Sequence, residues 1–245
     1  MNLLLLEEGD LLPGGTARVG GRRARHVREV LRATAGDRIA VGVLGGFVGE
    51  GEVLDLSGEE MLLRLRLLAP PPPPSPVSLL LALPRPKVLR RVLQAVASMG
   101  VKKLVLVGTY RVEKSYFASP HLAPEAIGRE LRLGLEQGRD TALPEVRVRR
   151  FFKPFVEDEL DALWPRATTR LLAHPAASRP LDSIAPGAGA LLALGPEGGF
   201  TPYEAEELER RGFAPFTLGP RPLRVDVAVP HAVGQVELCL RHRRA

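Results

Sequence analysis

Hydrophobic and polar residues alternate in blocks along most of the chain, and the blocks have the lengths of strands and helices. Short apolar runs bounded by turn residues predict buried strands. They cover residues 77–83, 102–108, 145–151, 169–173, 189–194 and 214–218. Longer segments with helical spacing predict helices over 86–99, 124–138, 154–164, 202–211 and 226–242. Because strands and helices alternate, we expect an α/β domain with a mainly parallel sheet.

The first 74 residues follow a different pattern, with β-type segments and one helix. Strands are expected over residues 37–43, 47–54 and 61–67. A helix is expected near residues 22–34, with apolar residues on one face and arginines on another: Val27, Val30 and Leu31 against Arg25, Arg28 and Arg32. This pattern predicts a small, mostly β, barrel-like module.

A proline run separates these two parts. Residues 69–76 read Ala-Pro-Pro-Pro-Pro-Pro-Ser-Pro. Consecutive prolines take the extended polyproline form and cannot continue a helix or a central strand, so the run is expected to be a stiff spacer. The predicted domains are therefore residues 1–74 and residues 75–245.

The distribution of charge indicates a polyanionic partner. The chain of 245 residues has a net charge of +6, with 45% hydrophobic and 25% charged residues, a composition typical of globular proteins. Between residues 18 and 38 there are seven arginines and two acidic residues. A basic face on an otherwise balanced module favours a nucleic-acid partner. The alternative is an ordinary solvated helix surface.

Cysteine content and hydropathy exclude several other classes. Cys239 is the single cysteine, so no internal disulfide can form, and no Cys/His cluster has zinc-ligand spacing. The apolar run Leu3–Leu6 is too short for a signal peptide or a membrane span. We therefore expect a cytoplasmic protein that uses no metal and no membrane.

The most informative segment follows the apolar run 189–194 and reads Leu194-Gly195-Pro196-Glu197-Gly198-Gly199-Phe200-Thr201-Pro202. Thr201 has Pro202 next to it and Glu204 three residues on, the signature of a capping box at a helix start. At such a glycine-rich turn, free N–H groups and missing side chains let a ligand approach the backbone. Glu197 would repel a phosphate, so a neutral or cationic ligand is expected. The alternative is that the glycines only form the turn.

A second loop of similar type follows the strand that is expected to end at Leu218. It reads Gly219-Pro220-Arg221-Pro222-Leu223-Arg224. Two Gly/Pro loops that each leave a strand end can face each other across one pocket at the edge of a sheet.

These two loops resemble those of the SPOUT-class RNA methyltransferases, and within that class the enzymes that methylate N3 of a uridine in 16S ribosomal RNA. The resemblance extends to His26–Arg32 with Gly36-Asp37, to residues 83–101, and to Glu136-Gln137 with Arg139. It implies a C-terminal trefoil-knotted α/β domain, an N-terminal PUA-like β-barrel domain, S-adenosylmethionine as methyl donor, small-subunit ribosomal RNA as substrate, and a homodimer.

The resemblance also implies the site residues. By position in the motifs, the cofactor would be bound by Leu194, Gly195, Glu197, Gly199, Leu218, Gly219, Leu223 and Arg224. The RNA would be bound by Arg22, Arg25, His26, Arg28 and Arg32. Singly, Leu194 and Leu218 could equally be core leucines at strand ends. No metal site is implied.

Arg224 is the expected catalytic residue. Methyl transfer to a uracil ring nitrogen requires loss of its proton, and the remaining charge is shared with the carbonyl oxygens. A guanidinium offers fixed, planar donors to such oxygens. The alternative is that Arg224 pairs with Asp226 or with a phosphate. No histidine is well placed in the sequence as a base, although His174, at the end of a strand, could line the pocket.

One segment departs from the family pattern. Leu223-Arg224 is followed by Val225-Asp226-Val227, where the family usually has threonine, glutamate and threonine. The carboxylate is kept one methylene shorter and both hydroxyls are missing. The missing hydroxyls motivate one rival hypothesis, a SPOUT enzyme with a different RNA target. A rival from a different class is a non-catalytic RNA-binding protein that keeps the pocket as structure.

The last predicted helix has a wide apolar arc. It is formed by Val225, Val227, Val229, Ala232, Val233, Val236 and Leu240. Because the arc is wider than packing on one side of a sheet requires, we expect the homodimer to form through the C-terminal domain.

Overall fold

The computed structural model describes residues 1–56, 58–181 and 188–242, which form two compact units. The first unit contains residues 1–73 together with 131–143, and the second contains 74–130 and 144–245. The chain thus passes between units at the proline run. The sequence does not indicate that residues 131–143 belong with the first unit.

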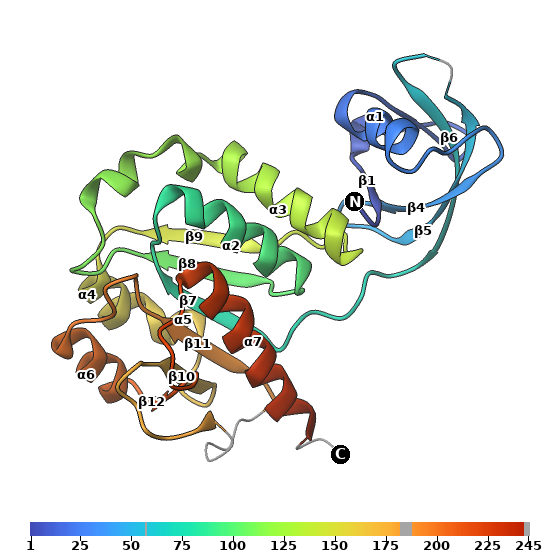
Figure 1. The fold of residues 1–245 in the computed structure, drawn as a ribbon. Coiled ribbons are helices and arrows are strands. Elements are labelled where there is room, and N and C mark those ends of the chain that lie inside the picture. The colour runs from blue at the N-terminus through green and yellow to red at the C-terminus, as the bar shows by residue number, and fades with distance from the viewer. Residues whose placement is uncertain (57, 182–187, 243–245) are drawn as a thin grey trace. The chain divides into compact units, whose positions relative to one another are not determined.

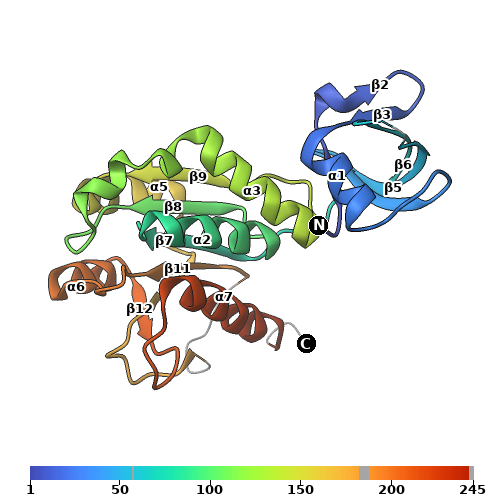
Figure 2. The same ribbon diagram turned by 45° about the horizontal axis from the view of Figure 1, so that its top comes forward.

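The first unit is a curled sheet of six strands in the order β1-β4-β5-β6-β3-β2 (Figure 2). Strands β1 and β4 are parallel, and the other pairs are antiparallel. The bounds are β1 Leu4–Leu6, β2 Leu11–Leu12, β3 Thr16–Val19, β4 Arg38–Val43, β5 Val48–Asp55 and β6 Met61–Ala69. Because β1 and β2 are opposite edges, the sheet is a half-barrel. The sequence predicted β4 to β6 but missed β1 to β3, which are too short for a period to show.

Helix α1, Gly21–Glu29, is shorter than predicted. Val27 is buried in the core of the first unit, as expected. The prediction was wrong for Val30 and Leu31, which are 62% and 47% exposed. The helix ends before them and Arg32 takes a left-handed φ of 55°, so they no longer follow the helical period.

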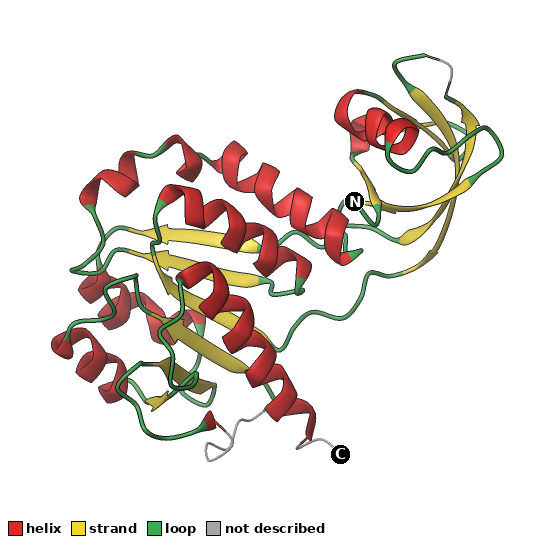
Figure 3. Ribbon diagram, in the orientation of Figure 1, coloured by secondary structure: helices red, strands yellow, loops and turns green. Residues whose placement is uncertain are grey.

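The second unit is a six-stranded parallel sheet with helices, as predicted (Figures 1 and 3). Its strand order is β12-β10-β11-β7-β8-β9, and all pairs are parallel. The strands are β7 Val77–Ala82, β8 Lys103–Val107, β9 Glu145–Arg149, β10 Thr169–Ala173, β11 Ala190–Leu194 and β12 Phe213–Phe216. The main helices are α2 Pro86–Ser98, α3 Pro124–Gly138, α6 Pro202–Arg210 and α7 Val225–His242. Residues 131–138 of α3 belong to the first unit.

Two short 3-10 helices lie between β8 and α3: η2 Lys114–Ala118 and η3 Pro120–Leu122. A third, η1 Glu8–Asp10, lies in the first unit. The single helix expected over residues 154–164 is instead three consecutive pieces: α4 Phe152–Pro154, the π-helical turn η4 Phe155–Glu159 and α5 Leu160–Leu163.

Helix α7 packs against α2 and against strands β7 and β11 (Figure 1). This packing buries almost all of the apolar arc that the sequence suggested for a partner. Val229, Val233 and Val236 are fully buried, and Val227 is the one member of the arc that is exposed. The arc is wide because the helix meets a second helix as well as the sheet. It therefore does not by itself indicate a dimer.

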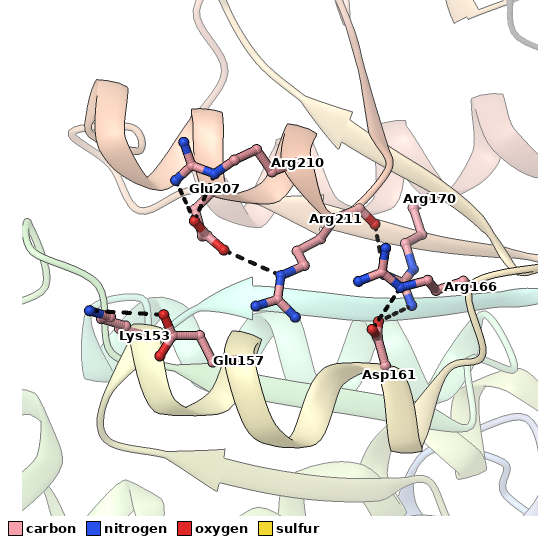
Figure 4. A network of polar contacts seen from close by, with 8 residues as sticks. All are labelled: Lys153, Glu157, Asp161, Arg166, Arg170, Glu207, Arg210 and Arg211. Atoms are coloured by element: carbon pink, nitrogen blue, oxygen red, sulfur yellow. Dashed lines mark hydrogen bonds and ion pairs between the residues drawn. The ribbon is translucent and has the colours of Figure 1, made fainter.

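A buried arginine joins three elements of the second unit (Figure 4). The Arg170 side chain on β10 is 1% exposed and donates to Asp161 Oδ1 at 2.7 Å, to the Trp164 carbonyl at 2.6 Å and to the Arg211 carbonyl at 2.7 Å. It thus ties β10 to α5 and to the end of α6. Nearby, the hydrogen bond from Arg210 holds the pKa of Glu207 below its usual range. The hydrogen bond from Arg170 to the Arg211 carbonyl thus holds the C-terminal end of α6, the helix that follows the glycine-rich loop.

Candidate active site

Two loops of the second unit leave the same edge of the sheet. Strands β10, β11 and β12 are parallel, so their carboxyl ends lie together, with β10 between the other two. Residues 195–201 follow β11, and residues 217–224 follow β12. His174, directly after β10, is half-buried at the same edge. Crevices at the carboxyl ends of parallel strands are the usual ligand sites of open α/β sheets.

The glycines of the first loop are required by its geometry. Gly199 has a φ of +74°, and its N–H donates to the Pro196 carbonyl at 2.8 Å. A Cβ at Gly195 would lie 3.0 Å from the Phe200 nitrogen, a tight contact to which the neighbouring backbone would have to yield. At Gly199, in contrast, the nearest atom to a Cβ is a flexible arginine end at 3.8 Å. The space beside Gly199 is therefore open to a ligand.

The start of α6 anchors the first loop, as the sequence predicted. The Thr201 hydroxyl accepts from the Glu204 N–H at 3.2 Å, and Glu204 Oε2 accepts from the Thr201 N–H at 2.8 Å. The other Glu204 oxygen accepts from the Tyr110 N–H at 2.7 Å. This buried carboxylate therefore fixes both the capping box and the loop that follows β8.

Glu197 and Leu194 differ in their surroundings. Leu194 ends β11 and is buried, as a core leucine would be. Glu197 is exposed on the loop, where Oε1 accepts from the Arg85 N–H at 3.4 Å and lies 4.0 Å from the Arg85 side chain. The carboxylate is thus loosely held and could bind a ligand hydroxyl or ammonium group.

The second loop is open to solvent along most of its length. Gly219 is exposed, with a φ of +119°, and no atom of the described residues lies within 4 Å of a Cβ built on it. Leu223 is 37% exposed, and Leu218 is half-buried with its carbonyl 3.3 Å from His231 Nε2 on α7. The Gly219 N–H donates to the Thr217 hydroxyl, which in turn donates to the Gly219 carbonyl. The loop therefore offers the open side of Gly219 and the apolar carbon of Leu223, which suit a flat ligand.

Arg224 lies at the end of this loop, and its side chain is 69% exposed. Its Nη2 is 3.2 Å from Asp226 Oδ2, the ion pair that the sequence allowed as an alternative role. Arg91 of α2 binds the same oxygen at 2.9 Å. Asp226 Oδ1 is buried without a hydrogen-bond partner among the described residues, so this oxygen does not cap α7.

Three arginines that sequence reasoning missed lie at or beside the loops. Arg85, just before α2, contacts Glu197, and Arg111 donates to the Gly198 carbonyl and, at 3.4 Å, to the Phe200 carbonyl. Arg91 of α2 binds Asp226, two residues after the second loop. They lie far from residues 194–226 in the sequence, and only the strand order brings them near. Nothing in the local sequence around them could have indicated this.

A large cavity of the second unit is separate from the residues assigned to the cofactor and lies at the end of the first loop, where α6 begins. It measures about 1030 Å³ and is lined from three segments that meet after β8, after β9 and at the start of α6. None of the eight residues assigned to the cofactor lines it. Its lining residues are Gly108, Thr109, Tyr110, Val112, Lys114, Phe117, Arg150, Phe151, Phe152, Lys153, Pro154, Thr201, Tyr203 and Glu204.

The structure places the five candidate RNA-binding residues of α1 and its C-terminal end in different surroundings. Arg25 and Arg32 are exposed. Arg22 binds the buried carboxylate of Glu136 at 2.6 Å, and Arg28 donates to the carbonyls of Leu56 and Gly58. Arg25 and Arg32 are therefore the arginines best able to reach a phosphate.

His26 is half-buried, and its Nε2 has no partner among the described residues. Burial, with the positive N-terminus and Arg22 nearby, lowers the pKa of His26 below its usual range. The shift favours the neutral form of this histidine, so Arg25 and Arg32 supply the charge of this surface.

Within residues 1–56, 58–181 and 188–242, no helix is long and apolar enough to cross a membrane. No group of three or more His, Cys, Asp or Glu side chains there could hold a metal ion.

Comparisons with known proteins give a consistent picture. Residues 71–237 match the model of the RNA methyltransferase domain. The chain is 30% identical over 234 residues to the ribosomal RNA small subunit methyltransferase E of Treponema pallidum (strain Nichols), across 93% of this chain and 87% of that protein. It is 23% identical over 231 residues to the ribosomal RNA small subunit methyltransferase E 1 of Borreliella burgdorferi, across 93% and 94%.

A solved structure agrees with the fold. The ribosomal RNA small subunit methyltransferase E of Neisseria gonorrhoeae, crystallised bound to S-adenosyl methionine, matches with a TM-score of 0.73. The match covers 97% of each chain at 20% sequence identity, so it bears on the fold alone.

Proposed function

Because the chain belongs to the RNA methyltransferase domain family, we propose that it transfers a methyl group from S-adenosylmethionine to N3 of a uridine in small-subunit ribosomal RNA. The observation that carries the proposal is the position of the two glycine-bearing loops at one sheet edge, on either side of β10. The two curated relatives, both named as small-subunit ribosomal RNA methyltransferases, support the choice of RNA.

The residues of these loops fit the proposed cofactor. Open space beside Gly199 and Gly219 allows a ligand to approach the backbone, and Leu223 offers exposed apolar surface to an adenine ring. The exposed Glu197 carboxylate suits the hydroxyls and positive charges of S-adenosylmethionine. When bound, this cofactor supplies an already activated methyl group. The protein therefore has to position the target base and stabilise the negative charge that develops on it.

Arg224 is the residue that we assign to stabilising the negative charge on the uracil ring. Its guanidinium is exposed and held on one side by Asp226 Oδ2, which Arg91 also binds. The remaining N–H donors are free to bind the uracil carbonyl oxygens as the N3 proton leaves. Fixed donors aimed at a developing anion stabilise it without reorganisation.

The target nucleotide can be tested directly. We expect small-subunit ribosomal RNA from cells that lack this protein to lose one N3-methyluridine, and incubation with the protein and S-adenosylmethionine to restore it. A different restored nucleotide would favour the second candidate function, a change of RNA target. The observation behind that candidate is the exposed Val227, which stands where the resembling family has a hydroxyl.

RNA affinity should depend on the two exposed arginines of the first unit. We expect Arg25→Ala with Arg32→Ala to weaken RNA binding and to lower the slope of log affinity against log salt by about 1 to 2, because each phosphate contact releases counterions. S-adenosylmethionine affinity should not change. Arg66→Ala, at an exposed arginine of β6, is the control. An unchanged slope in the double variant would mean that this surface is only solvated.

The protein should form a homodimer through the second unit. Val227 and Leu238 are 49% and 48% exposed on α7 and lie eleven residues apart, which places them on one face. We expect light scattering at micromolar concentration to give twice the chain mass of 26.6 kDa. Val227→Asp with Leu238→Asp should give a single chain, and Phe47→Asp in the first unit should not. A monomeric parent protein would exclude the dimer.

A further inference from the structure

The large cavity beyond the first loop has the chemistry of a ligand site, although the proposed transfer reaction does not use it. Its volume of about 1030 Å³ is at the upper end of the range for ligand pockets. Two of the chain's three tyrosines and three of its eight phenylalanines line it. These are Tyr110, Phe117, Phe151, Phe152 and Tyr203.

Several of these rings are exposed to solvent. Tyr110 is 86% exposed, Phe151 67% and Tyr203 48%. They come from three separate segments, the loops after β8 and β9 and the first turn of α6. Single exposed aromatic residues are ordinary, but several around one hollow mark a binding surface. Flat rings that stand free at a cavity mouth can stack on flat ligand groups.

The charges around the cavity favour an anionic ligand. Lys114, Arg150 and Lys153 line it, and the one carboxylate that does so, Glu204, is buried and occupied by the N–H groups of Tyr110 and Thr201. Lys153 pairs loosely with Glu157, at 3.9 Å. The cavity therefore presents cations and no free carboxylate of its own.

Two further details indicate a built site. Thr109 is 8% exposed and lines the cavity, and its Oγ1 has no hydrogen-bond partner among the described residues. A hydroxyl can donate and accept, so it can bind either kind of base-edge atom. The Arg150 guanidinium carbon lies 5.6 Å from the centre of the Phe117 ring, which holds this cation at the cavity wall.

We propose that this cavity binds an unpaired nucleotide of the RNA substrate, adjacent to the nucleotide that is methylated. The inference rests on the proposed function for the identity of the substrate. Stacking of bases on aromatic side chains, with cations along the phosphates, is how proteins hold single-stranded RNA. Arg111 belongs to the loop that lines the cavity and also contacts the carbonyls of Gly198 and Phe200, so the cavity adjoins the loop assigned to the cofactor.

The test is the affinity for a labelled, unstructured oligouridine, measured by fluorescence anisotropy. Loss of one base–aromatic stack should weaken binding about 5- to 150-fold. We expect the double variant Tyr110→Ala with Phe151→Ala to bind oligouridine more weakly by at least this factor. Both side chains are largely exposed, so the fold should persist. The pair Tyr110→Phe with Phe151→Tyr keeps both rings and should bind as the parent does.

Charge variants add an independent readout. Lys114→Ala should lower the slope of log affinity against log salt by about 0.7, the value for one contact to a single strand. Lys103→Ala, at an exposed lysine at the opposite end of β8, should leave the slope unchanged. In all of these variants, the affinity for S-adenosylmethionine and the molar mass should match those of the parent protein.

The possible results separate this inference from the proposed function. If Tyr110→Ala with Phe151→Ala binds oligouridine as tightly as the parent protein does, the cavity inference is overturned. The proposed function still stands if the parent protein methylates ribosomal RNA. If the parent methylates no RNA, the function fails, and the oligouridine measurement still decides the cavity. If the ring deletions change the molar mass and not the RNA affinity, the cavity holds a second copy of the chain and the inference is overturned.

Discussion

Arg224→Ala is expected to slow methyl transfer by about 100- to 1000-fold, the usual effect of removing one fixed donor to a developing anion. S-adenosylmethionine should still bind within a few-fold of the parent. The cofactor is a sulfonium cation before transfer, so an arginine gains little from it in the ground state. The target base becomes anionic only as its proton leaves, and an interaction made only at that stage raises the rate rather than the affinity.

The structure indicates that Arg224→Ala removes a side chain without disturbing the fold. Arg224 is 69% exposed, and Arg91 remains bound to Asp226 Oδ2 when the Arg224 side chain is removed, so no carboxylate loses its only cation. Arg221→Ala, at an exposed arginine of the same loop, is the matched control and should keep its rate. Single-turnover methylation of pre-bound RNA measures the step itself. A normal rate constant for Arg224→Ala would remove this residue from the mechanism.

Gly199→Val should abolish detectable binding of S-adenosylmethionine, because the side chain would fill the open space beside the first loop. The variant also places a branched residue at a φ of +74°, which costs about 1–2 kcal/mol in stability. Loss of binding could then reflect strain rather than the site, so a control with equal strain is needed.

Gly212→Val supplies that control. Gly212 has a φ of +87°, and among the residues that the structure describes no atom lies within 4 Å of a Cβ built on it. It lies after α6 rather than in either loop. Calorimetric titration should show binding by Gly212→Val and none by Gly199→Val, at similar melting temperatures. Unchanged affinity in Gly199→Val would mean that the ligand lies elsewhere in the fold.

Most of the second unit could be read from the sequence. Its six strands and its long helices are where the apolar runs and helical spacings place them, with ends that differ by a few residues. The capping box at Thr201 and Glu204 was also visible, because its three-residue spacing is a local signal. Such features depend on neighbours in the sequence, so a single chain contains the information needed to find them.

Other features were hidden because their partners are distant in the sequence. Strand β1 pairs in parallel with β4, and residues 131–143 belong with the first unit, contacts that no local period can indicate. The same holds for the cavity at Tyr110, Phe151 and Tyr203. Its aromatic residues lie in three segments, each of which reads as an unremarkable loop or helix start.

The sequence by itself determined the alternation of strands and helices, the two glycine-bearing loops and the family resemblance. These follow from periodicity and from turn residues, whose backbone preferences are local. The tertiary structure decided which side chains meet. The strand order brings Arg85 and Arg111 to the first loop and Arg91 to Asp226 at the start of α7. The packing of α7 on α2 buries an apolar arc that suggested a partner. Pairing between distant segments depends on the register and the order of the whole sheet, and no short stretch of sequence encodes either.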